Sequence, residues 1–239
     1  MFTSGPLWAV IAGHLCNNYV NYTLLTSLPI FMKESLNFDI KQNGALSALP
    51  YLCQFVASLG VGYMADLLLE RGFLTTKSVR KSFQCFSFVG TAVCIACVGL
   101  MNCEMRQLAV ALLCLCTIFM SFNRAGYNVN HLDLAPSYAG VLFGITNTAA
   151  TIPGMVAPLI AGILTPNGTA EEWRNVFYVC AAVAAAGALI YFVLAEGSLQ
   201  PWAIPPESNL EMHIVAELQV TPLTATDQAG ASDGDVNIP

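Results

Sequence analysis

Charged residues are scarce in this chain, and six long stretches have almost none. Only 10% of the 239 residues are Asp, Glu, Lys or Arg, and 56% are hydrophobic, whereas a soluble domain has about 25% charged residues. This composition argues against a soluble helical protein. A helix of about twenty apolar residues crosses the roughly 30 Å hydrocarbon core of a bilayer, and only helices and closed barrels satisfy their backbone there. The sequence therefore predicts a membrane protein surrounded by lipid.

The apolar stretches predict six membrane-spanning helices. They show none of the ten-residue alternation that is typical of an outer-membrane barrel, so the predicted fold class is an all-α membrane protein. The first stretch lacks a basic start and is too long for a cleaved signal peptide. Residues 1–200 are predicted to form a six-helix bundle whose spans cover about 6–32, 42–66, 80–103, 106–129, 136–165 and 174–196.

Recognisable enzyme and metal motifs are also absent. The sequence has no dinucleotide, P-loop or zinc motif, and most of its nine Cys are scattered singly in apolar runs, as small helix-packing residues are. We therefore expect no metal and no cofactor, and we expect no nucleic-acid partner. A membrane enzyme is a remote alternative, because His131 and Asp133 are the only close His/acid pair and no nucleophile motif stands beside them.

Basic residues are concentrated in the loop after the second predicted span. Arg71, Lys77, Arg80 and Lys81 are four of the nine Lys and Arg residues. Since short cytoplasmic loops carry an excess of Lys and Arg, this loop is predicted to be cytoplasmic, and an even number of spans places both termini on the same side. Residues 201–239 have six acids and no Lys or Arg, which predicts a disordered acidic cytoplasmic tail.

The first span carries an unusual stripe of polar side chains. Spacings of three, four and seven place many of these residues on one side of the helix, and polar side chains inside a span are costly enough to suggest function. The stripe favours a water-filled substrate cavity; hydrogen bonding between helices is the alternative. Its members are His14, Asn17, Asn18, Asn21 and Tyr22.

The fifth span is polar and prone to kinking near its middle. Asn147 and Thr151 precede Pro153-Gly154, and transporters often place discontinuous helices at this depth. Asn147 and Thr151 are therefore further cavity candidates. In the next loop, Asn167-Gly168-Thr169 is a candidate glycosylation sequon on the predicted non-cytoplasmic side.

Arg124 is the one basic residue that falls inside a predicted span. It could bind an anionic substrate, or its side chain could reach the cytoplasmic surface from the end of the fourth span. The second role is favoured, because the residue lies near the predicted cytoplasmic end.

Several segments resemble one transporter family. The most specific is N-V-N-H-L-D-L-A-P-S-Y-A-G-V-L-F-G-I-T-N-T-A-A-T-I-P-G-M over residues 128–155, supported by T-L-L-T-S-L-P from Thr23, T-T-K-S-V-R-K from Thr75 and E-W-R-N-V-F-Y from Glu172. Over about residues 6–203 the chain resembles the C-terminal six-helix half of a Major Facilitator Superfamily transporter. It is similar to the anion transporters that include sialin, the vesicular glutamate transporters and the sodium–phosphate cotransporters.

The sialin branch looks closest on two positions. Glutamate-type members carry an Arg where this chain has Asn17 and another where it has Ser137, and Arg124 departs from both branches. The resemblance implies 3+3 inverted repeats, alternating access, and a proton or sodium gradient that drives an organic anion, such as an acidic sugar, across a lysosomal, other vesicular or plasma membrane. It also implies a cytoplasmic gating set of Gly62, Asp66 and Arg71, with Asn130, His131 and Asp133 nearby.

The six spans contain no mid-membrane Asp or Glu, so His14 is the only titratable candidate well inside a span whose ordinary pKa lies near the working pH. The resemblance implies that the decisive charges belong to an N-terminal six-helix half. We therefore expect the chain to be part of a twelve-helix transporter, with that half as its partner. The alternatives are an inactive or regulatory short isoform, a homodimer of half-transporters, and a sodium-coupled phosphate transporter.

Overall fold

A computed structural model describes residues 1–204 of the chain, with the side chains of residues 40–43 left undescribed. The long helices are α1 (Gly5–Glu34), α2 (Ile40–Glu70), α3 (Thr76–Val98), α4 (Arg106–Ser121), α6 (Ala139–Leu164) and α7 (Ala170–Leu194), and a short helix, α5 (Tyr127–Leu134), follows α4. Short 3-10 turns lie at Cys103–Met105, Phe122–Arg124, Pro136–Tyr138 and Pro201–Ala203. The all-α prediction is confirmed, since the described residues contain no strand.

Five segments are long and apolar enough to cross a membrane in the part of the chain that is described: Gly44–Glu70, Thr76–Val98, Cys103–Leu134, Pro136–Leu164 and Ala170–Leu194. The first predicted span does form a helix, α1, of 30 residues, but it is not among these five. His14, Asn17, Asn18 and Asn21 lower its hydropathy. These polar residues are compatible with a membrane span because most of them point into the bundle rather than to lipid.

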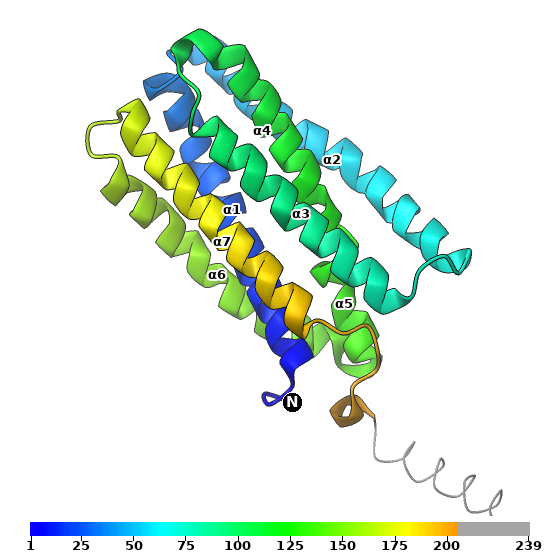
Figure 1. Cartoon of the computed structure of the whole chain (residues 1–239). Coiled ribbons are helices and arrows are strands. Elements are labelled where there is room, and N and C mark those ends of the chain that lie inside the picture. Colours follow the sequence, from blue (N-terminus) through cyan, green and yellow to red (C-terminus); the bar gives the residue numbers. More distant parts are fainter. Residues whose placement is uncertain (205–239) are drawn as a thin grey trace, which may run out of the picture. The chain divides into compact units, whose positions relative to one another are not determined.

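Helix α1 lies inside the bundle of residues 1–203. It packs mainly against α6 and α7, whereas α3 packs against α7 and α4, and α2 packs on α4 (Figure 1). The largest buried cluster joins α1, α3, α4 and α7 and includes Phe31, Phe88, Trp173 and Phe177. Because lipid is as apolar as these side chains, their burial stabilises the bundle through close van der Waals packing between the helices. The α2–α3 loop lies at the same end of the bundle as the start of α1 and the end of α7 (Figure 1).

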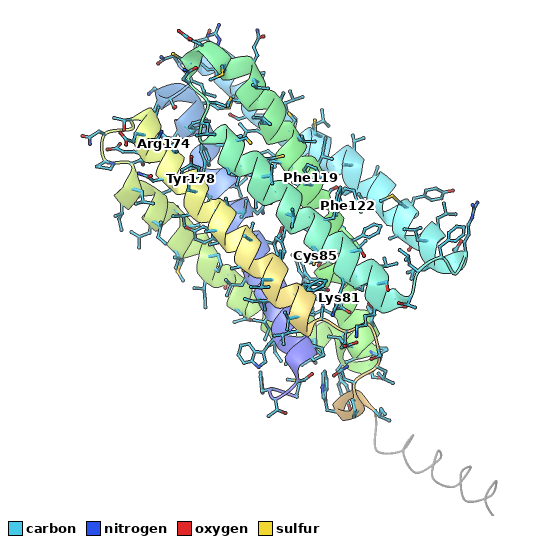
Figure 2. The ribbon with its side chains drawn as sticks, in the orientation of Figure 1. Lys81, Cys85, Phe119, Phe122, Arg174 and Tyr178 are labelled. Carbon is cyan, nitrogen blue, oxygen red and sulfur yellow. The ribbon has the colours of Figure 1, made fainter. Side chains whose placement is uncertain are left out.

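Charged side chains mark opposite ends of the bundle. Lys81 lies near the start of α3, and Arg174 lies near the start of α7, at the opposite end; Phe119, Phe122 and Tyr178 lie between them (Figure 2). Apolar side chains between two charged ends are what a bilayer requires, so the chain is a multi-pass membrane protein.

The predicted fourth span, about 106–129, is broken rather than continuous. Helix α4 ends at Ser121, a 3-10 turn covers Phe122–Arg124, and α5 begins at Tyr127. Between them lies Gly126, where an added Cβ would sit 2.3 Å from Gln84 Oε1. Only glycine at this position lets the Gln84 side chain come this close to the backbone. Gln84 Oε1 can then accept a 3.0 Å hydrogen bond from the Tyr127 N–H.

The bundle extends further along the chain than the predicted start of the tail at residue 201. Pro201–Ala203 form a 3-10 turn, the Gln200 N–H donates to Leu134 O at 2.9 Å, and Ala203 is buried beside Leu7 and Ile11. The six-helix unit therefore extends past residue 200. The rest of the tail prediction, residues 205–239, lies outside the described residues.

Candidate functional site

A polar cavity of about 420 Å³ opens between α1, α2, α5 and α6. Amide side chains dominate its wall, and none of the residues that line it in the described part of the chain is acidic. The lining comprises His14, Asn17, Asn18, Asn21, Leu25, Tyr51, Gln54, Asn123, Arg124, Tyr127, Asn128, Phe143 and Asn147. The lining residues of α1 lie near the middle of its length, so the cavity lies deep in the predicted membrane.

Five of the seven predicted cavity residues line this space: His14, Asn17, Asn18, Asn21 and Asn147. The other two, Tyr22 and Thr151, do not. Tyr22 lies against Gly154, where an added Cβ would meet its ring at 3.4 Å. Thr151 is exposed and donates to Thr148 O at 2.7 Å, within its own helix.

The two polar roles proposed for α1, cavity wall and interhelical bonding, occur together. Asn123 Nδ2 donates to Asn17 Oδ1 at 2.7 Å, and Asn17 Nδ2 donates to the Tyr127 hydroxyl at 3.4 Å. Asn18 Nδ2 donates to Ala150 O at 3.0 Å. Buried polar groups are costly unless they are hydrogen-bonded, so these bonds fix the wall and leave less of it free to rearrange.

Arg124 lies in the cavity wall, not at the cytoplasmic surface, and the favoured prediction for it is corrected. The reason is the break after α4. Ten further residues, most of them helical, separate Arg124 from the end of the span at Leu134, which corresponds to roughly 15 Å of helical rise. Arg124 is exposed to the cavity and has no ion-pair partner among residues 1–204. An uncompensated cation at this depth attracts an anion.

Two histidines meet at one hydroxyl beside the cavity. His14 Nδ1 lies 3.2 Å from Thr146 Oγ1, and His131 Nε2 lies 2.8 Å from the same oxygen. All three side chains are buried. His131 was grouped with the gating residues on sequence, but the structure places it next to His14. Thr146 was not among the predicted site residues, although the polar segment of the fifth span was a signal for it.

The predicted gating residues do not form one cluster. Asp66 and Arg71 are exposed, and neither has an ion-pair partner within residues 1–204. Gly62 has open space around its Cα. Asp133 instead pairs with Arg80, whose Nε lies 2.6 Å from Asp133 Oδ2.

Arg80 is a residue that the sequence reasoning missed. It was counted among the four basic residues that predict membrane orientation and within the T-T-K-S-V-R-K segment, but no site role was predicted for it. Helix α3 begins at Thr76, so Arg80 is already one turn inside it and buried, and its Nη1 also donates to Ala125 O at 3.1 Å. In the same region Asn130 Nδ2 donates to the Tyr191 hydroxyl at 2.9 Å, which joins α5 to α7.

The sequon residue Asn167 lies in the exposed α6–α7 loop. Its Nδ2 donates to Glu172 Oε1 at 2.8 Å, and Thr169 caps α7 by accepting from the Glu172 N–H at 3.3 Å. Glu172 Oε2 in turn accepts from the Thr169 N–H at 3.1 Å, which completes a capping box between Thr169 and Glu172. Glu172 therefore holds both the acceptor Asn and the Thr of the sequon.

Comparison with known proteins identifies relatives of this chain. It is 46% identical to sialin of Homo sapiens over 199 residues, which are 83% of this chain and 40% of that protein. It is 46% identical to sialin of Ovis aries over 85% of the chain and 41% of that protein. It is 40% identical to vesicular glutamate transporter 2 of Homo sapiens over 88% of the chain and 36% of that protein.

The chain therefore spans about 40% of the length of these relatives. The predicted resemblance to the sialin and vesicular glutamate transporters is confirmed, and the relatives are transporters rather than enzymes. Residues 10–222 match the Major Facilitator Superfamily. Together with an all-α membrane bundle around a polar cavity, this match shows that the chain belongs to the Major Facilitator Superfamily.

Proposed function

We propose that this chain forms one half of a secondary active transporter that moves an organic anion by alternating access. The observation that carries the proposal is Arg124, an unpaired cation in a mid-span cavity whose described lining contains no carboxylate. An unpaired positive charge in the wall of such a cavity favours an anionic ligand, and an arginine can bind a carboxylate through two parallel hydrogen bonds.

The amide groups of the wall suit the rest of an acidic sugar. Asn and Gln offer both donors and acceptors, and hydroxyl groups on a substrate need both. Higher identity to sialin than to a vesicular glutamate transporter supports the same substrate class, with sialic acid as the probe to use. The family setting also supports a lysosomal or other vesicular membrane, or the plasma membrane, and an N-terminal six-helix half as partner.

Proton coupling is the second part of the proposal. Within residues 1–204, His14 is the titratable imidazole that lines the cavity, and imidazole is the side chain whose charge changes between about pH 5 and 8. A proton gradient would then drive the anion. Sodium-driven phosphate transport remains the alternative to be tested against it.

The test supplies the missing half. We would co-express this chain with the N-terminal six helices of human sialin, reconstitute the pair in proteoliposomes and measure sialic acid uptake under an inward proton gradient. Uptake should require both halves and the gradient, and Arg124→Gln should lower it at least tenfold. Arg106→Gln is the matched control, because Arg106 is exposed and stacks on Phe38 at 5.4 Å, away from the cavity lining.

Two results would contradict the proposal. Equal uptake by the wild type and Arg124→Gln would remove Arg124 from the anion site. Uptake of phosphate under a sodium gradient, with none of sialic acid under a proton gradient, would favour the alternative. If the paired chain is inert and instead lowers uptake by full-length sialin, the regulatory-isoform interpretation stands.

A further inference from the structure

The bond between His131 and Asn128 determines which nitrogen of His131 carries a proton. His131 Nδ1 lies 3.0 Å from Asn128 O. Because a carbonyl oxygen can only accept, Nδ1 must be protonated. A neutral imidazole carries one N–H, so Nε2 of neutral His131 is an acceptor, and the Thr146 hydroxyl, 2.8 Å away, must donate to it.

The direction of the next hydrogen bond follows from this one. A threonine hydroxyl has one hydrogen and two lone pairs. If Thr146 donates to His131, its oxygen accepts from His14 Nδ1, at 3.2 Å. The neutral arrangement is therefore a directed chain, His14 Nδ1–H to Thr146 O–H to His131 Nε2.

We propose that His14, Thr146 and His131 form a proton-binding site in which the two imidazoles share one proton through the Thr146 hydroxyl. The site deepens the proposed function and rests on it for its role in transport, because it names where this half holds the driving proton. Three hydrogens move and none is lost. A proton binds His14 at Nε2, the Nδ1 proton of His14 passes to Thr146, and the hydroxyl hydrogen of Thr146 passes to Nε2 of His131.

The product is neutral His14 and a cationic His131 whose two N–H groups donate to Asn128 O and to Thr146. The hydroxyl can then turn its hydrogen toward His14 Nδ1 or toward Phe143 O, which lies 3.2 Å from Thr146 Oγ1. Both hydrogen-bond directions are thus available without movement of heavy atoms. The proton has moved from the cavity wall to α5.

One proton, rather than two, follows from the distance between the rings. The ring centroids of His14 and His131 are 6.5 Å apart, and two positive charges this close repel strongly when they are shielded from water. Within residues 1–204 no carboxylate bonds to either ring. Asp133, two residues beyond His131, is paired with Arg80, and Arg124 adds positive charge to the same cavity wall.

The remaining neighbours of the pair are neutral. From α5, the Tyr127 ring lies 4.9 Å from the His14 ring. From α6, the Phe143 ring lies 5.7 Å from His14 and 5.5 Å from His131. From α3, Gln84 bonds to the Tyr127 N–H, and from α7, Tyr191 bonds to Asn130. Among residues 1–204, the hydrogen-bond partners of the two imidazoles are therefore the Thr146 hydroxyl, which they share, and the Asn128 carbonyl on His131 Nδ1; none of them is charged, which is the arrangement that a shared proton needs.

The test is favoured by the small number of histidines. The full chain has three, so a sample labelled with ¹⁵N-histidine, reconstituted in lipid nanodiscs, gives a spectrum that single His→Gln substitutions can assign. At high pH we expect His131 as the Nδ1–H tautomer, the opposite of the form that a free imidazole prefers. On lowering the pH we expect the signals of His14 and His131 to move together in two steps, as coupled sites do.

Substitutions at Thr146 distinguish two histidines that share a proton through the hydroxyl from two histidines that are only close together. Thr146→Val keeps the shape and removes the hydroxyl, so the proton of the first step should stay on one histidine and only that residue's signals should move in that step. Thr146→Ser should behave as the wild type. Thr148→Val is the control, because Thr148 is exposed and its hydroxyl donates to Gly144 O in its own helix.

Two results would overturn the inference. One is a His131 found as the Nε2–H tautomer, which the wild-type chain alone decides. The other is a Thr146→Val variant in which the signals of both histidines still move together in the first step. These spectra need neither the N-terminal half nor an anion. Coupled histidines in a chain that carries no anion would contradict only the transport proposal. Uncoupled histidines in a working transporter would contradict only this site.

Discussion

Arg80 and Asp133 form a buried ion pair that ties α3 to the end of α5. Arg80 Nε donates to Asp133 Oδ2 at 2.6 Å and Nη2 donates to Oδ1 at 3.3 Å, while only 7% and 15% of the two side chains are exposed. Arg80 Nη1 also bonds to Ala125 O in the break between α4 and α5. One arginine therefore holds both ends of α5.

Removing one partner of this pair should be costly. We expect Asp133→Asn or Arg80→Gln to lower the free energy of unfolding by about 3–5 kcal/mol, because a buried charge is left without its partner. Thermal and denaturant unfolding in detergent would measure this. Lys77→Gln is the matched control: it breaks a 2.6 Å pair with Glu196 whose side chains are 48% and 36% exposed, and such pairs contribute roughly 0–1 kcal/mol. An equal loss of stability in Lys77→Gln and in the Arg80 or Asp133 variants would contradict the expectation that the buried pair contributes more.

Gly126 should not tolerate a side chain. In Gly126→Ala, the new Cβ would lie 2.3 Å from Gln84 Oε1 and 2.9 Å from Gln84 Cβ, so Gln84 must move and its bond to the Tyr127 N–H is lost. Overpacking of this kind costs about 1–3 kcal/mol, measured as reduced thermal stability. Gly140→Ala, which meets nothing within 4 Å, is the control, and a similar loss there would show that the tight contact is not the cause.

The capping box should limit glycosylation at Asn167. Glu172→Ala removes the carboxylate that binds Asn167 Nδ2, the atom to which a glycan would be attached. We expect a larger glycosylated fraction on a gel-mobility assay in microsomes. Glu171→Ala is the control, because Glu171 pairs with Arg174 instead. Identical occupancy in the two variants would mean that the hydrogen bond does not compete with the modifying enzyme.

Cysteine labelling can check the predicted orientation. All nine cysteines are free, and Cys103 alone among them is exposed. We expect a membrane-impermeant maleimide to label Cys103 from the non-cytoplasmic side, whereas a cysteine introduced by Lys77→Cys in the basic loop should react only from the cytoplasmic side. The buried Cys116 should react only after denaturation. Labelling of both loops from one side would refute the topology.

Hydropathy and family motifs were enough to predict the fold class, and the polar residues inside two predicted spans were enough to predict five of the cavity residues. These features depend on local composition or on spacing along one helix. The Arg80–Asp133 pair and the His14–Thr146 contact join residues 53 and 132 positions apart, and no periodicity within one segment reveals such partners. Arg124 was misplaced because its depth depends on whether the span ends after α4 or continues through α5.

The polar character of α1 has a consequence for how the chain is made. A segment with His and several Asn partitions poorly from the translocon into lipid on its own, because each such residue opposes insertion. Its main partners, α6 and α7, come after α2, α3, α4 and α5 in the chain, so they are synthesised well after α1. We therefore expect α1 to reach its final depth late in biogenesis, after the ribosome has delivered the helices that shelter its amides.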